Sequence, residues 1–86
     1  MIGNDLFVMN ALKIAYGNHN ALLQEGRVAG VQTVSGTGAN RIGFEFLARN
    51  YPTKGAEIMT PTPTWPVHNW IPDIVGMKHK PYRYYN

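Results

Sequence analysis

One stretch of the chain decides its fold: Val31-Gln32-Thr33-Val34-Ser35-Gly36-Thr37-Gly38-Ala39. Its first four residues close a run over residues 28–34 that is apolar at most positions instead of alternating. Such a run predicts a strand buried on both faces, which is typical of parallel sheets. The small residues that follow predict a tight loop, and a helical pattern covers residues 39–50. A buried strand, a tight loop and a helix in succession predict an α/β chain.

The small residues of the loop also suit an anion. Ser35, Gly36 and Thr37 would bring several backbone N–H groups and two hydroxyls together at a helix N-terminus. Unpaired amides and the positive end of the helix dipole both favour a dianionic phosphate there. A strand-to-helix turn with a purely structural role would accept the same residues, so both interpretations stay open. Arg41 stands where a dinucleotide fingerprint needs its third glycine, and no Gly-Lys-Ser or Gly-Lys-Thr is present.

The rest of the chain alternates between helical and extended patterns. We expect helices over residues 4–16, 20–24, 39–50 and 66–75, and strands over residues 28–34, 57–60 and 77–85. Residues 61–64 read as a stiff loop, because proline has no N–H to donate to a sheet. This order predicts crossover connections and a three-stranded, mostly parallel sheet with helices on both faces and two open edges. The chain therefore resembles a piece of a larger sheet domain.

Composition narrows the function classes. The chain has 86 residues, enough for one small domain, and no cysteine for a disulfide or a thiolate metal site. Its histidines lack ligand spacing, so no metal is expected. The net charge of +3 comes from scattered basic residues, which argues against nucleic-acid binding. No apolar run spans a membrane and nothing resembles a signal peptide, so we predict a cytoplasmic protein and leave a mitochondrial location open.

Two residues near the second predicted crossover could meet a ligand. Trp65 follows the proline-rich loop at the carboxyl end of a strand, the edge where open α/β sheets bind ligands. Its indole could stack on a planar heterocycle or simply cap the core. His68 lies three residues later, on the same face of the helix, and could orient a cofactor partner or pack in the core.

These motifs together resemble the aspartate aminotransferases, a family of class I pyridoxal-phosphate-dependent aminotransferases. The similarity covers nearly the whole chain, in the same order and without a large gap. The residues that carry it are Ile2-Gly3, Phe7, Ala11, Val31 to Ala39, Arg41-Ile42-Gly43, Phe46-Leu47, Pro63-Thr64-Trp65, His68, Gly76-Met77 and Tyr82-Arg83-Tyr84-Tyr85.

The resemblance implies a cofactor and a set of roles. It implies pyridoxal 5′-phosphate, with Ser35, Gly36 and Thr37 on the phosphate and Trp65 stacked on the pyridine ring. His68 would support the aspartate that pairs with the ring nitrogen. Residues 1–86 would form the N-terminal part of the large, cofactor-binding domain of a fold-type I transferase, which has three layers and works as a homodimer on amino acids and 2-oxo acids. Pro66-Val67 stands where the family commonly has Gly-Asn, which changes the local start of the helix.

The same resemblance places the reacting groups later in the family's chain than the position of Asn86. These are the lysine that forms the Schiff base, the aspartate on the ring nitrogen and the arginines that grip the substrate. The four lysines here match none of them, so we predict no catalytic residue in this chain and no transaminase turnover by it alone. Two alternatives stay open, namely a non-catalytic module for a phosphate ligand and a truncated gene product without activity.

Overall fold

The structure is a computed structural model that describes residues 2–86, and it divides the chain into two compact units. The first unit ends at Thr33, and the second unit comprises Val34–Asn86. Each unit is built from its own short helices or strands, so each is described by itself.

The first unit contains helices α1 (Asp5–Tyr16) and α2 (Ala21–Gln24). Asn4 caps α1, because its side-chain oxygen accepts from the Phe7 N–H at 3.0 Å, and Asn20 caps α2 through the Leu22 N–H at 2.9 Å. Gly17 ends α1 with a φ of 89°, a conformation that costs glycine little. The helices predicted at residues 4–16 and 20–24 are thus confirmed.

The strand predicted at residues 28–34 is wrong. This segment is extended but belongs to no sheet among the described residues. Two hydrogen bonds tie Gln32 to the start of the chain: its N–H donates to the Ile2 carbonyl at 2.8 Å, and its Oε1 accepts from the Asn4 N–H at 2.9 Å. A ladder needs a neighbouring strand that offers alternating donors and acceptors, and residues 2–4 offer only a single backbone bond. The side chain of Val31 accordingly stays 55% exposed.

The second unit contains α3 (Ser35–Asn50), β1 (Glu57–Thr62), α4 (Val67–Ile74) and β2 (Lys78–Arg83). Helix α3 begins four residues before the predicted Ala39, so the expected loop is the first turn of the helix. Strands β1 and β2 pair in parallel, from Glu57 opposite Lys78 to Thr62 opposite Arg83. The crossover through α4 confirms an α/β chain with parallel strands, although the described sheet has two strands and not three.

Strand β1 also runs further than the sequence predicts, because it includes Pro61. The Thr62 carbonyl accepts from the Tyr84 N–H at 3.0 Å, so the polar backbone groups of Thr62 face β2. In a parallel pair alternate residues face the partner, which turns the nitrogen of Pro61 toward the outer edge. No ladder bond is lost there, and the prediction that Pro61 would stop the strand is wrong for that reason.

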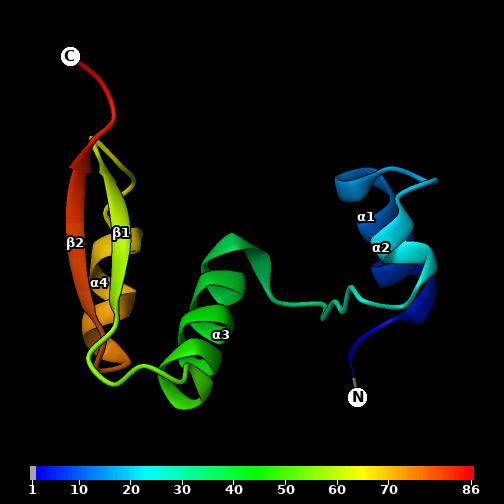
Figure 1. Ribbon diagram of the computed structural model, residues 1–86, viewed down its shortest axis with the longest axis horizontal. Coiled ribbons are helices and arrows are strands. Elements are labelled where there is room, and N and C mark those ends of the chain that lie inside the picture. The colour runs from blue at the N-terminus through cyan, green and yellow to red at the C-terminus, as the bar shows by residue number, and fades with distance from the viewer. Residues whose placement is uncertain (1) are drawn as a thin grey trace. The chain divides into compact units, whose positions relative to one another are not determined.

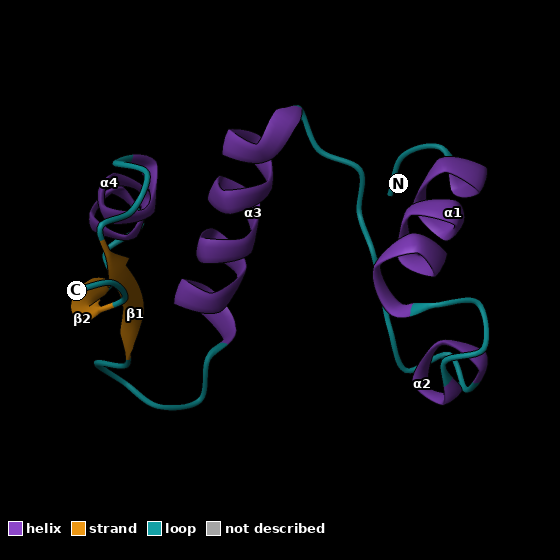
Figure 2. Cartoon of the chain, turned by 90° about the horizontal axis from the view of Figure 1, so that it is seen from above, coloured by secondary structure: helices purple, strands orange, loops and turns teal. Residues whose placement is uncertain are grey.

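Helix α4 covers one face of the β1–β2 pair, and α3 packs beside α4 (Figures 1 and 2). The buried residues of this unit lie at the α4 layer: Thr60, Ile71 and Pro72. Figure 1 shows that α3 and α4 both begin at the end of the unit where β1 and β2 finish. This end therefore gathers two helix N-termini and the carboxyl ends of both strands, and it holds every residue singled out as a candidate site.

Candidate functional site

The first turn of α3 presents backbone donors. The first bond inside the helix joins the Gly38 N–H to the Val34 carbonyl at 3.1 Å, and the amides of Gly36 and Thr37 precede it. Val34 occupies the N-cap position and supplies no side-chain hydrogen bond. Val34 itself therefore does not satisfy these amides, and backbone amides at a helix N-terminus are donors of the kind that binds an anion.

The backbone of this turn is also open to approach. A Cβ built on Gly36 would meet no atom of the chain within 4 Å. Ser35, just before it, has a φ of 60°, a left-handed conformation that few residues other than glycine adopt. Strain of this kind is found at ligand-binding turns more often than elsewhere. Both features favour the phosphate interpretation of Ser35, Gly36 and Thr37 over that of a plain structural turn.

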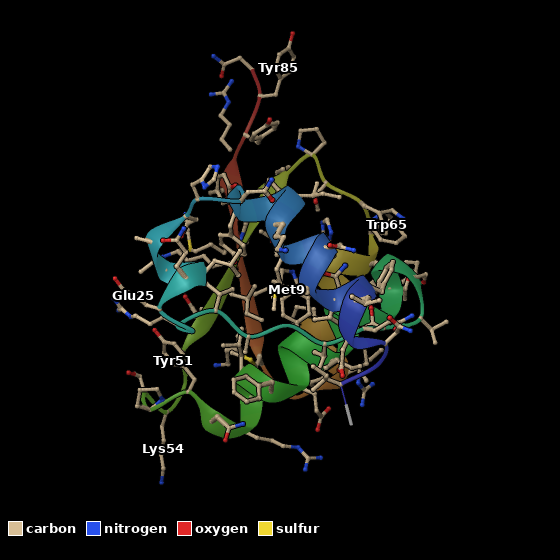
Figure 3. All side chains as sticks on the ribbon, turned by 90° about the vertical axis from the view of Figure 1, so that its right-hand side faces the viewer. Met9, Glu25, Tyr51, Lys54, Trp65 and Tyr85 are labelled. Atoms are coloured by element: carbon tan, nitrogen blue, oxygen red, sulfur yellow. The ribbon has the colours of Figure 1, made fainter. Side chains whose placement is uncertain are left out.

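Trp65 lies on the loop that enters α4, and its side chain stands at the surface of the unit (Figure 3). It is 51% exposed, so it does not cap a core in this structure. The imidazole of His68 meets the indole edge-on, with ring centroids 5.7 Å apart and planes at 86°. This T-shaped contact orients the indole, and the half of the Trp65 surface that stays exposed is open to a planar ligand.

His68 is half-buried and held by a neighbour that sequence reasoning gave no role. The Thr64 Oγ1 lies 2.7 Å from His68 Nδ1, a hydrogen bond that spans four residues. If the Thr64 hydroxyl donates, Nδ1 is the acceptor and Nε2 carries the proton, free to point at a third group. Sequence reasoning had no clear signal for this pair, because Thr64 precedes α4 and meets His68 only through the conformation of the loop that enters the helix.

The structure brings the predicted site residues to one end of the second unit. The first turn of α3 and the loop that carries Trp65 both face the carboxyl ends of the strands (Figure 1). In Figure 3, Tyr51 and Lys54 mark the opposite end. The edge predicted from the sequence depends on a strand at residues 28–34, which does not form. The actual reason is that α3 runs antiparallel to β1, which returns the chain to the same edge.

Charges near the site are few. On α3, Glu45 accepts from Arg49 Nε at 2.7 Å and from Arg41 at 3.2 Å. The hydrogen bond from Arg49 is the main cause that lowers the pKa of Glu45 below its ordinary 4.5, and the charges of both arginines add to it against a smaller opposing effect of burial. No group of three or more metal-ligating side chains occurs in the part of the chain that the structure describes.

Comparison with known proteins now decides the family. The sequence profile of the aminotransferase class I and II family matches residues 7–86. The chain belongs to this family. It is 43% identical over 74 residues to the cytoplasmic aspartate aminotransferase of Oryza sativa subsp. japonica, covering 86% of this chain and 18% of that protein. It is 40% identical over 86 residues to the mitochondrial aspartate aminotransferase of Arabidopsis thaliana, covering 100% of this chain and 20% of that one.

The solved structures agree. A mitochondrial aspartate aminotransferase from Trypanosoma brucei superposes with a TM-score of 0.91 at 38% identity, over 100% of this chain and 22% of that chain. This aminotransferase chain thus spans about a fifth of the length of the relatives it matches. The relatives include cytoplasmic and mitochondrial forms, and no described helix is long and apolar enough to cross a membrane.

Proposed function

We propose that residues 1–86 form the N-terminal part of the cofactor-binding domain of a homodimeric aspartate aminotransferase, which transfers an amino group between aspartate and 2-oxoglutarate. One observation carries the proposal. The first turn of α3, where the N-cap residue Val34 makes no side-chain hydrogen bond, faces the same end of the second unit as the exposed indole of Trp65. A phosphate donor set and a flat aromatic face at one end suit a ligand that combines a phosphate with a planar ring.

The residues present fit pyridoxal 5′-phosphate. The amides of Gly36 and Thr37 precede the first bond of the helix, and the space beside Gly36 is open. These amides, with the hydroxyls of Ser35 and Thr37, would hold the phosphate. Trp65 would lie against the pyridine ring. His68, held at Nδ1 by Thr64, would direct Nε2 toward the carboxylate that the family places on the ring nitrogen.

When bound, the cofactor supplies an electron-withdrawing ring that stabilises negative charge on the substrate carbon. The residues of this chain bind and orient, and none of them touches the reacting carbon. The part-buried Thr64–His68 pair holds the imidazole in one orientation, because its Nδ1 is hydrogen-bonded to the hydroxyl. We expect no transaminase turnover from the chain alone, as measured by oxaloacetate release from aspartate and 2-oxoglutarate.

The binding test uses the two tryptophans as a matched pair. Trp65 and Trp70 are both exposed, at 51% and 62%, and both belong to the α4 region. Titration of the chain with pyridoxal 5′-phosphate should give saturable quenching of tryptophan fluorescence. Trp70→Ala should retain it and Trp65→Ala should abolish it. Equal loss in both variants, or no saturable quenching in the parent chain, would reject the proposed site.

A second arm isolates the phosphate. Pyridoxal has the same ring and aldehyde but no phosphate, so it forms the same adducts with surface lysines. It should quench Trp65 much more weakly at equal concentration, because the α3 amides have no anion to bind. Equal quenching by the two compounds would show that the first turn of α3 takes no part.

A further inference from the structure

Polar side chains are buried where α4 packs on the β1–β2 sheet. Three atoms there lack a hydrogen-bond partner among the described residues: Thr60 Oγ1, Asn69 Oδ1 and His79 Nδ1. Thr60 is the most buried of these residues, with only 2% of its surface exposed. We call Thr60, Asn69 and His79 the α4 seam, because they come from β1, α4 and β2 respectively.

The register places all three on the same interface. Ile58 is opposite His79 in the sheet, and Thr60 follows Ile58 by two residues, so Thr60 and His79 share a face. Asp73 of α4 lies 3.4 Å from His79 Nδ1, which identifies this face as the one that α4 covers. The distance allows an ion pair when the imidazole is protonated, but the atoms do not meet the geometry of a hydrogen bond.

The same geometry sets Asn69 level with Thr60. Asn69 precedes Asp73 by four residues, so it lies on the same side of α4, about 6 Å nearer the helix N-terminus. Thr60 lies about 6.7 Å beyond Ile58 toward the carboxyl end of β1. Helix α4 and β1 run in opposite directions (Figure 1), so both steps lead to the same end of the unit. The Thr60 hydroxyl and the Asn69 side-chain oxygen therefore lie at the same level of the interface between α4 and the sheet, and neither has a hydrogen-bond partner among the described residues.

We propose that the α4 seam is an internal water-binding site, in which one bound water bridges Thr60 to Asn69 and a second continues from it to His79. A buried polar atom without a partner loses its hydrogen bonds to bulk water and gains none in exchange. Native proteins therefore almost always give such an atom a hydrogen-bond partner. A hydroxyl, an amide oxygen and an imidazole nitrogen provide the donors and acceptors that an ordered water needs. The bridge holds α4 on the sheet at Asn69, the residue after His68, close to the loop that carries Trp65.

Thr60→Val tests the bridge because it removes the hydroxyl and keeps the shape. With bridging water, the substitution breaks a hydrogen bond and lowers the folding equilibrium constant by about five-fold. With a dry hydroxyl, it removes an unsatisfied group and raises that constant. The matched control is Thr62→Val, which makes the same change on the same strand at an exposed residue. Urea unfolding of the 86-residue chain and both variants supplies the comparison.

The site is supported if the folding equilibrium constant of Thr60→Val is about five-fold lower than that of Thr62→Val. It also requires nuclear Overhauser cross-peaks between water and the Thr60 side chain of the unsubstituted chain. Equal or greater stability of Thr60→Val overturns it, as does the absence of those cross-peaks. A chain that unfolds without a cooperative transition overturns it too, because the seam requires α4 packed on the sheet.

Discussion

Substitution of Thr37 is the most direct single-residue test of the phosphate hypothesis. Its hydroxyl is in the first turn of α3, beside the amides that precede the first helical hydrogen bond. A hydrogen bond to a charged group contributes about 1.5–3 kcal/mol, so Thr37→Val should raise the Kd for pyridoxal 5′-phosphate roughly ten-fold or more. Thr53→Val, an exposed change in the loop before β1, should leave the Kd unchanged. The quenching titration measures both, and equal affinities would remove Thr37 from the site.

Gly30 tests the packing of the first unit. A Cβ at this position would lie 3.0 Å from Val8 Cγ1 and 3.2 Å from Leu12 Cδ2, closer than such contacts normally are. Gly30→Ala should therefore destabilise the first unit by about 1 kcal/mol or more, since overpacking forces side chains from their rotamers. Gly43→Ala is the opposite control, because a Cβ at Gly43 of α3 would meet open space. This substitution should raise the free energy of unfolding of α3 by about 0.5–1 kcal/mol. Hydrogen exchange of α1 and α3 amides reports each unit separately.

At the scale of elements, we expect the stability of α3 to fall at acid pH. The folded-state pKa of Glu45 is lowered, mainly by the hydrogen bond from Arg49. The pairing therefore stabilises the helix above the ordinary pKa of 4.5, and this part is lost as pH falls through the lower folded value. Circular dichroism at 222 nm should show that helicity falls as the pH is lowered. The fall should be smaller in Glu45→Gln, because this variant has no carboxylate at position 45 to protonate. An identical acid transition in both chains would show that the pairs contribute nothing to α3.

The elements also show what the sequence could and could not predict. Helix periodicity and the caps Asn4 and Gly17 were sufficient for α1, because those signals act within a few residues. The strand at residues 28–34 could not be judged in that way, since an apolar run becomes a strand only when a partner strand exists. The prediction that Pro61 ends the strand is wrong because the edge toward which a backbone nitrogen points depends on the register with the partner strand, which the local sequence does not contain. The site residues lie at the predicted edge because α3 runs antiparallel to β1, a consequence of topology that local patterns do not contain.

At the scale of the whole molecule, the described chain leaves apolar side chains uncovered. Ile42, Phe46 and Leu47 lie at helical spacing and make the apolar face of α3, yet all three are exposed, Phe46 by 64%. Among residues 2–86, the buried hydrophobic core side chains are Val8 and Ile71 alone. A sheet of two strands and four short helices buries too little surface to stabilise such a chain strongly. Association with other polypeptide surface is the expected consequence of apolar faces left in water.

The α3 face gives this expectation a measurable form. Sedimentation velocity of the chain over rising concentration should show self-association, and Phe46→Glu should weaken it because a charge at the centre of the apolar face must be desolvated on contact. Glu at this position also stays compatible with a helix, so secondary structure should persist. Lys13→Glu, at an exposed residue of α1, changes the net charge by more and leaves the α3 face unaltered, so it serves as the control. If Lys13→Glu weakens association as much as Phe46→Glu, net charge and not the Ile42–Phe46 surface governs association.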